Sequence, residues 1–153
     1  MPNTPAAIGQ GITALIGNEL VVDRDMALAE TLLRAVGKTV RLEDEAQMDA
    51  VTAVSGSGPA YVFHLIETMA AAGEAEGLPA DLAMELALTT VAGAGALAEA
   101  SDENASQLRI NVTSPNGTTQ AALEVLMNEI DGFPSIVSKA VAAAANRSRE
   151  LGK

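Results

Sequence analysis

The chain contains no cysteine, no tryptophan and a single histidine, His64. The lack of cysteine excludes disulfides, thiol nucleophiles and cysteine-ligated metals, and one histidine cannot build a histidine-rich metal site. We therefore expect no metal. Aromatic residues make up only 2% of the sequence, whereas apolar residues make up 48%. The core must come from alanine, leucine, valine, isoleucine and methionine, and the abundance of alanine favours closely packed helices.

Basic residues are also scarce. Nine Lys and Arg are set against 20 Asp and Glu, so the 153 residues carry a net charge of −11. Nucleic-acid binding needs clustered positive side chains, and so does attraction to anionic membrane surfaces. The composition therefore predicts no nucleic-acid partner and no membrane partner, and the acidity mainly promotes solubility.

Long hydrophobic runs are missing as well. Residues 82–98 are rich in apolar side chains, but Glu85, Gly93 and Gly95 interrupt them. A helix buried between protein partners fits this pattern better than a transmembrane helix. The opening residues, Met1–Ala6, do not have the composition of a signal peptide. These features predict a cytoplasmic protein.

The first 43 residues predict a strand, a helix and a second strand. Ile12–Ile16 is a short apolar run between glycines, which is typical of a strand. From about Asp25 to Val36 the apolar residues recur at helical spacing, and we expect Gly37 to end that helix in a left-handed conformation. Thr39–Leu42 is the second strand. Two strands are too few for an independent sheet, so this segment is predicted to be the end of an α/β domain.

Residues 44–153 predict helices only. The expected helices lie around residues 46–54, 62–69, 81–100, 121–127 and 133–144, and residues 101–107 form a polar connection or a short helix. Gly77 ends one helix and Pro79 begins the next. The helix at 81–100 is apolar on most sides, so it needs more cover than one small bundle provides. This predicts a homo-oligomer, namely a dimer with interleaved helices.

Two glycine patterns, residues 9–14 and 93–98, match the dinucleotide fingerprint G-x-G-x-x-A. The fingerprint binds pyrophosphate only between a strand and a helix. The first pattern leads into a strand and the second lies inside a helix, so we expect neither to bind phosphate.

Three further features have a functional and a structural interpretation. Ser55–Tyr61 is either a ligand-contacting loop or a break between helices, and composition favours the break. His64 lies beside an apolar stripe and could donate a proton, although such residues are more often structural. The acidic residues among positions 43–49 could hold a cation, but they more often complement a helix dipole.

The run Asn111–Thr119 is the most informative part of the chain. It places small hydroxyl residues, a proline and a glycine directly before the helical segment Ala121–Met127. A helix N-terminus has unsatisfied N–H groups and a partial positive charge, and it can hold a carboxylate or phosphate. The same residues also make a plain capped turn. The residues by themselves leave both interpretations open.

Several motifs occur in the order and spacing of one enzyme family. They are Met1-Pro2-Asn3-Thr4-Pro5-Ala6, Ser55 with Gly58-Pro59-Ala60-Tyr61, Gly77-Leu78-Pro79, Val112 to Thr119, and the terminal Arg147 to Leu151. Over its entire length the chain resembles pyrroline-5-carboxylate reductase. The resemblance implies an oxidoreductase that converts 1-pyrroline-5-carboxylate to L-proline, the last step of proline biosynthesis, by hydride transfer from NADPH or NADH.

The resemblance also implies a fold that is mainly α. A helical dimerisation domain, residues 44–153, would follow a strand–helix–strand remnant of a Rossmann-like domain, residues 1–43. The nucleotide loop and most of the family's sheet are missing, so we expect a truncated chain that is inactive alone. Met1 would be an internal methionine of the parent or a start site placed on it. The alternative is a non-catalytic helical dimerisation module or fragment.

Site residues follow by position. The substrate carboxylate would meet the N–H groups of Thr118 and Thr119 and the Thr119 hydroxyl, in a loop shaped by Ser114, Pro115 and Gly117. Glu45, Ser57 and Pro59 would line the substrate pocket, and Pro2, Asn3, Thr4 and Asn111 would contact the cofactor. No acid is singled out, because a pyrroline already protonated at nitrogen needs none. Asn116 stands where the family usually has glycine, and asparagine tolerates a left-handed conformation, so we expect the turn to be kept.

Overall fold

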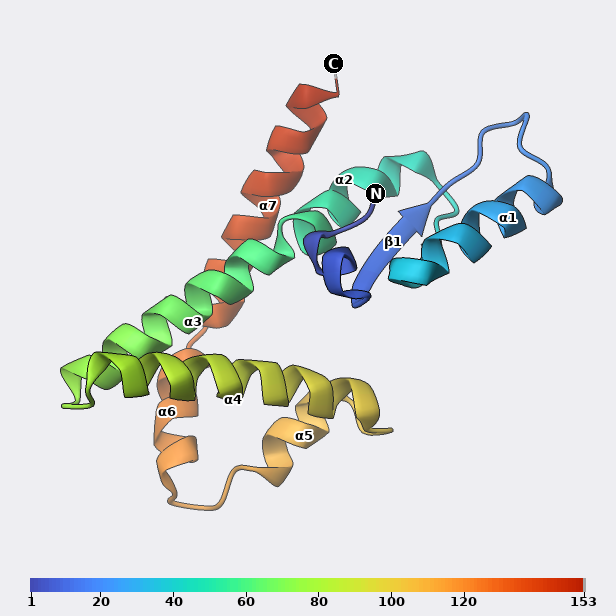
Figure 1. Ribbon diagram of the computed structural model, residues 1–153. Coiled ribbons are helices and arrows are strands. Elements are labelled where there is room, and N and C mark those ends of the chain that lie inside the picture. The colour runs from blue at the N-terminus through green and yellow to red at the C-terminus, as the bar shows by residue number, and fades with distance from the viewer. Residues whose placement is uncertain (153) are drawn as a thin grey trace. The chain divides into compact units, whose positions relative to one another are not determined.

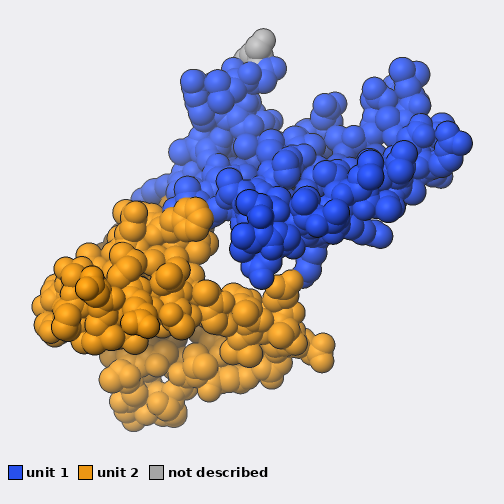
Figure 2. Space-filling view, viewed as in Figure 1, with its two compact units in different colours: residues 1–61, 139–153 blue, residues 62–138 orange. Residues whose placement is uncertain are grey.

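The computed structural model describes residues 1–152 and is mainly helical (Figure 1). In chain order the elements are β1 (Gly11–Leu15), α1 (Asp23–Leu33), β2 (Gly37–Arg41), α2 (Met48–Val51), α3 (Gly58–Ala75), α4 (Ala80–Ala100), α5 (Ala105–Asn111), α6 (Thr118–Leu126) and α7 (Phe133–Leu151). The predicted fold, helices preceded by a strand–helix–strand segment, is confirmed. The chain divides into two compact units (Figure 2). Unit 1 is residues 1–61 with the end of the chain from Lys139, and unit 2 is residues 62–138.

Unit 1 contains a two-stranded parallel sheet. β1 and β2 pair with Gly11 opposite Gly37, and α1 makes the crossover that parallel strands require. Thr13 and Ala14 of β1 are buried. The strands predicted from the sequence are confirmed to within two residues at each end.

The prediction that Gly37 ends the first helix is wrong. The helix does not end there in a left-handed conformation: α1 ends at Leu33, a 3₁₀ turn runs to Val36, and Gly37 begins β2 with φ 143° and ψ −156°. This φ is accessible essentially to glycine alone. A β-carbon at Gly37 would also collide with the backbone of Gly11. The close start of the two strands therefore requires glycine at position 37.

Unit 2 is built on the contact between α3 and α4. Ala70 of α3 packs against Ala83 and Ala87 of α4, with Ile66 at the edge of the cluster. Small side chains at these positions allow the two helices to approach closely. Gly77 ends the α3 segment with φ 97°, as the sequence predicts.

The core of the described chain is small. Its buried apolar residues are Ala14, Ala53, Ala70, Ala83, Ala87 and Ala145, and no large side chain within residues 1–152 is fully buried. The chain exposes 10912 Å². Two separate compact units of half its mass would together expose roughly 8,700 Å². About 2,000 Å² of extra surface is therefore uncovered, which is the scale of an obligate interface.

Part of the exposed apolar surface lies on α4. Leu82, Leu86 and Leu97 share one side of this helix and are 42%, 48% and 56% exposed. Among the described residues, α4 is the one helix long and apolar enough to cross a membrane by length and composition, with 11% of its apolar window buried. One such helix is weak evidence for a span, because helices that pack in protein interfaces share its composition.

Candidate functional site

The segment Val112–Gly117 connects α5 to α6 in unit 2, and with residues 118–120 we call it the 112–120 loop. Its start is tied to the end of α5. The Thr113 hydroxyl donates to the Arg109 carbonyl at 2.6 Å, and the Thr113 N–H donates to the Ile110 carbonyl at 3.0 Å. The Gly117 N–H then donates to the Ser114 carbonyl at 3.1 Å and closes a turn. The loop is therefore fixed at both ends.

Asn116 is the residue that gives the turn its shape. Its φ of 58° is positive, the only such value at a non-glycine position among the described residues. The Asn116 N–H donates to the Gln120 side-chain oxygen at 2.8 Å, and the Gln120 amide in turn donates to Glu124 at 3.3 Å. Sequence reasoning missed Gln120. Its place as the third residue of α6, from which a glutamine can reach back to the N–H groups before the helix, is the signal that could have identified it.

Gly117 is the N-cap of α6, and it offers no side chain to cap the helix. A β-carbon there would displace the Ser114 hydroxyl and lie 3.0 Å from the Ser114 carbonyl oxygen, so glycine fits this turn best. The first bond of the helix runs from the Ala121 N–H to the Gly117 carbonyl at 3.2 Å. The N–H groups of Thr118, Thr119 and Gln120 consequently have no acceptor within the helix. Three parallel donors at the positive end of a helix can bind one carboxylate.

Exposure around these donors favours ligand access. Ser114 and Thr118 are exposed, whereas Thr119 is half-buried. Of the sequence-predicted substrate residues of the loop, Ser114 and Gly117 lie in the turn before α6, and Thr118 and Thr119 lie in its first turn. Whether they contact substrate stays a prediction.

A hollow of about 340 Å³ adjoins the loop between α5 and α6. Arg109 lines it and donates to the Met127 sulfur at 2.8 Å and to the Ser106 hydroxyl at 3.4 Å. Sequence reasoning did not single out Arg109. Its guanidinium adds a positive charge beside the loop, and Glu124 lines the same hollow with a negative one.

Asn111, a predicted cofactor residue, ends α5 and is exposed. Its side-chain amide donates to the Glu103 carboxylate at 2.6 Å, and its side-chain carbonyl accepts from Gln107 at 2.8 Å. Both polar groups are engaged, so a cofactor contact would have to replace one of these bonds.

The other predicted cofactor residues lie in unit 1. Met1 pairs with Ala14 through two backbone bonds of 2.8 and 3.0 Å. The Asn3 side-chain carbonyl accepts from the Ile12 N–H at 3.0 Å, and its amide donates to the Ser55 hydroxyl at 3.4 Å. These bonds anchor the opening motif to β1 and to the turn before α3. Pro2 and Thr4 remain exposed on either side of Asn3.

The segment Ser55–Tyr61 is not an open loop. A π-turn covers Thr52–Gly56, and only Ser57 separates it from α3. The Ser57 N–H donates to the Thr52 carbonyl at 2.8 Å, and the Tyr61 hydroxyl donates to the Ala53 carbonyl at 3.0 Å. π-turns are uncommon and frequently occur at functional sites.

The predicted pocket residues of unit 1 are only partly accessible. Ser57 and Pro59 are half-buried, whereas Glu45 is exposed at the start of a 3₁₀ turn. Asp44 caps this turn by accepting from the Ala46 N–H at 2.9 Å. Asp44 therefore serves as a cap, and no group of three His, Asp or Glu side chains within residues 1–152 is placed to hold a metal.

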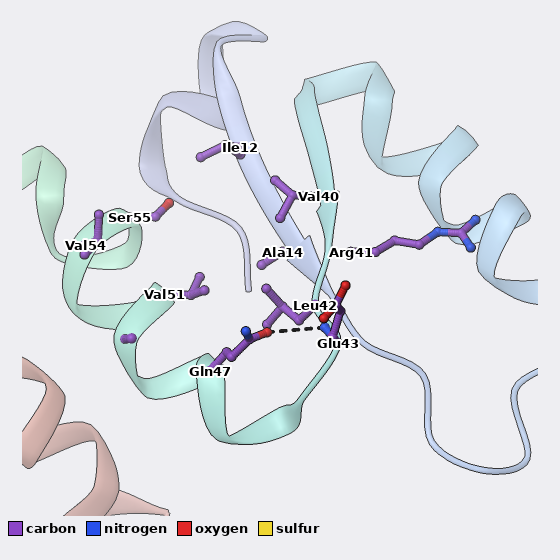
Figure 3. A pocket seen from close by; sticks show the side chains of 11 residues that line it. Ile12, Ala14, Val40, Arg41, Leu42, Glu43, Gln47, Val51, Val54 and Ser55 are labelled. Atoms are coloured by element: carbon purple, nitrogen blue, oxygen red, sulfur yellow. Dashed lines mark hydrogen bonds between the residues drawn. The ribbon is translucent and has the colours of Figure 1, made fainter. Parts of the chain in front are cut away.

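Unit 1 also contains a cavity of about 570 Å³ between the sheet and the helical segment that follows it (Figure 3). Its lining residues are Ile12, Ala14, Val40, Arg41, Leu42, Glu43, Gln47, Ala50, Val51, Val54 and Ser55. Most are apolar. The Gln47 side chain accepts from the Glu43 N–H at 3.2 Å at one edge.

Arg41 extends away from this cavity toward α1 (Figure 3). Its guanidinium donates to both carboxylate oxygens of Glu30, at 2.5 and 3.1 Å. This hydrogen bonding lowers the pKa of the Glu30 carboxyl below its ordinary value. The pair joins α1 to β2 and has a structural role.

The glycine patterns and His64 do not form the ligand sites that the sequence left open for them. Residues 9–14 lead into β1, and residues 93–98 lie inside α4, so neither glycine pattern forms a strand–turn–helix phosphate site. His64 is 75% exposed on α3 and contacts Glu67 at 3.1 Å, one helical turn away.

Known proteins provide an independent comparison. Residues 45–151 match the family described as pyrroline-5-carboxylate reductase dimerisation. The pyrroline-5-carboxylate reductase of Synechocystis is 48% identical over 153 residues, covering 100% of this chain and 56% of the relative. That of Pseudomonas aeruginosa is also 48% identical, covering 100% of this chain and 55% of the relative.

The comparison with solved structures gives the same family. A pyrroline-5-carboxylate reductase from Coxiella burnetii matches with a TM-score of 0.94 and 42% identity, over 100% of this chain and 56% of that one. The pyrroline carboxylate reductase of Plasmodium falciparum, described with NADP bound, matches with a TM-score of 0.85 and 35% identity, over 100% and 62%. The chain spans about half the length of the curated relatives it matches.

Proposed function

Because this chain belongs to the pyrroline-5-carboxylate reductase family, we propose that it carries the substrate-binding part of an enzyme that reduces 1-pyrroline-5-carboxylate to L-proline. The reductant is NADPH or NADH, the reaction is the last step of proline biosynthesis, and the compartment is the cytoplasm. The observation that carries the proposal is the 112–120 loop, where a turn closed by Gly117 leaves three N–H groups of α6 without helical acceptors.

The loop binds the carboxylate of the imino acid. The N–H groups of Thr118 and Thr119 and the Thr119 hydroxyl donate to it, while Ser114 and Gly117 keep the turn tight. Each charge-assisted hydrogen bond contributes about 1.5–3 kcal/mol. The helix dipole and the nearby Arg109 add favourable charge. Together these groups hold the five-membered ring in one orientation. A substrate held in this way reacts faster, because the entropic cost of orienting it toward the hydride donor is met on binding.

The nicotinamide cofactor, when bound, supplies the hydride. The opening motif contacts the nicotinamide ring. The Asn3 side chain is held by bonds to Ile12 and Ser55, while Pro2 and Thr4 stay exposed and can touch the ring. Asn3 thus acts by holding its neighbours in place. Asn111 contacts the cofactor after releasing one of its present partners. The substrate nitrogen enters already protonated, so these residues position the ring and need no side-chain acid.

We expect this chain to be inactive alone. Neither glycine pattern in the described residues lies between a strand and a helix, where the fingerprint binds the pyrophosphate of a dinucleotide. Glu45, Ser57 and Pro59 are the residues of unit 1 that contribute to substrate binding. The assembly is a homodimer or a higher homo-oligomer, supported by the uncovered apolar stripe of α4.

Proline binding tests the loop directly. The ¹⁵N-labelled chain would be titrated with L-proline, the proposed product, and we expect shifts at the amides of Thr118 and Thr119. Thr119→Ala should weaken binding roughly tenfold or more, because one charge-assisted bond is lost, whereas Thr119→Ser should keep it. Thr68→Ala on α3 is the matched control. Binding that survives Thr119→Ala unchanged would remove this residue from the site.

Consumption of NADPH with 1-pyrroline-5-carboxylate tests the reaction. The protein encoded by the complete gene should turn over, and Thr119→Ala should mainly raise its KM. Turnover by residues 1–153 alone would contradict the expected inactivity. A chain that dimerises but leaves L-proline unbound would instead support the non-catalytic dimerisation module.

A further inference from the structure

Asn116 and Gly117 form the one Asn-Gly pair in the sequence. Asparagine followed by glycine is chemically the least stable asparagine sequence, because glycine has no side chain to hinder attack by its own backbone nitrogen. Asn116 is exposed and has a positive φ of 58°. This pair therefore combines a reactive sequence with solvent access.

The side-chain amide of Asn116 is also unrestrained. Each of the other six asparagines has its side-chain carbonyl bonded: Asn3 to Ile12, Asn18 to Leu20, Asn104 to Gln107, Asn111 to Gln107, Asn128 to Ile130 and Asn146 to Arg149. At Asn116 the recorded bond within residues 1–152 is made by the backbone N–H and leaves the carboxamide able to rotate. Sequence and structure thus select the same asparagine independently.

The geometry points to Asn116 as a site of spontaneous deamidation that alters the charge of the 112–120 loop. The Gly117 nitrogen loses its proton to solvent base and attacks the Asn116 side-chain carbonyl carbon. The bond to the side-chain nitrogen breaks, ammonia leaves and a five-membered succinimide forms. Water then opens the ring at either carbonyl, which yields aspartate or isoaspartate. No oxidant or reductant is required.

The Gly117 N–H donates to the Ser114 carbonyl at 3.1 Å in the closed turn. Attack therefore requires this bond to open, and the turn lies on an exposed connection where local opening costs least. A ligand that holds the turn closed should slow the reaction. This protection rests on the proposed function, whereas the deamidation does not.

The product places a negative charge one residue before the N-cap of α6. The new carboxylate interacts favourably with the positive end of the helix dipole. It therefore repels the carboxylate of a ligand from the N–H groups of Thr118 and Thr119. Isoaspartate further lengthens the backbone by one bond within the turn that the Gly117 N–H closes onto the Ser114 carbonyl. Conversion of Asn116 thus changes the loop from accepting an anion to rejecting one.

Peptide mass mapping tests the modification. The full chain would be aged at mildly alkaline pH in H₂¹⁸O, cut with trypsin and read across residues 110–139, which contain Asn111, Asn116 and Asn128. We expect heavy oxygen and the mass change from amide to acid at Asn116 alone, and none at that position in Asn116→Gly. Intact Asn116 after the other two have converted, or equal conversion of all three, would overturn the proposal.

Titration with L-proline tests the consequence. Asn116→Asp should bind L-proline more weakly than both the fresh chain and Asn116→Gly, and added L-proline should slow the deamidation. Equal binding by Asn116→Asp and Asn116→Gly would refute the change of loop charge as the cause. If the fresh chain and Asn116→Gly both leave L-proline unbound, the proposed function fails, while the mass map still decides the modification.

Discussion

Replacing Leu86 with glutamate should abolish self-association of this chain. Leu86 lies on the apolar stripe of α4 and is 48% exposed. Full burial of a leucine contributes about 1.5–3 kcal/mol, so covering the exposed half contributes about 1 kcal/mol. In a two-fold dimer the residue counts twice, so Leu86→Ala should weaken dimerisation by about 2 kcal/mol, or roughly thirtyfold in Kd.

Glutamate has a larger effect than alanine. An interface that covers Leu86→Glu must desolvate a carboxylate in each copy, at a cost of several kcal/mol per ion. Both substitutions keep a good helix former, so α4 itself should persist. We therefore expect Leu86→Glu to be monomeric at concentrations where the wild type is a dimer, with unchanged far-UV circular dichroism.

Sedimentation velocity over a concentration series measures this directly. The matched control is Leu32→Glu, which places the same charge on α1 of unit 1 at a leucine that is 66% exposed. This variant should associate like the wild type. Dimers of Leu86→Glu as tight as those of the wild type would refute the reasoning, and so would a wild-type chain that stays monomeric at micromolar concentration.

Two further substitutions probe unit 1. Gly37→Ala should destabilise the chain by about 1–3 kcal/mol in urea unfolding, because of its φ of 143° and its contact with Gly11, whereas Gly58→Ala, with open space around it, should cost little. Arg41 lowers the pKa of Glu30, so this contribution to stability is complete above the unfolded-state pKa and is lost as the pH falls through the lower folded-state pKa. Glu30→Gln should remove that acid-dependent loss from unfolding curves measured over the same pH range, and an unchanged acid slope would contradict the assignment.

The sequence predicted the elements better than their ends. Periodic apolar residues located α3, α4 and α7, because helical spacing is a property of the chain itself. The Gly37 interpretation was wrong, because a helix stop and a close strand approach both call for glycine and only the neighbour, Gly11, distinguishes them. Composition favoured a break between helices at Ser55–Tyr61, and the structure places that break at Ser57, between a π-turn and α3.

The candidate site was predicted in part. Residues Ser114 to Thr119 were recognised from their small, polar composition and from the resemblance to a family. Gln120 was missed, because its function depends on a side chain that folds back one helical turn to reach the Asn116 N–H. The role of Asn3 at the cofactor stays a prediction, and only the structure shows that its side chain is bonded to Ile12 and Ser55.

Composition, periodicity and motif order determined by themselves that this is an acidic, alanine-rich helical chain related to pyrroline-5-carboxylate reductases. These properties depend only on local spacing and residue type. Tertiary structure decided which groups are already engaged and which are free. It showed that the carboxamide of Asn111 is held and that of Asn116 is not, and that the N–H groups at the start of α6 lack acceptors. Those facts depend on where the chain turns, because a hydrogen bond forms only between groups that folding brings together.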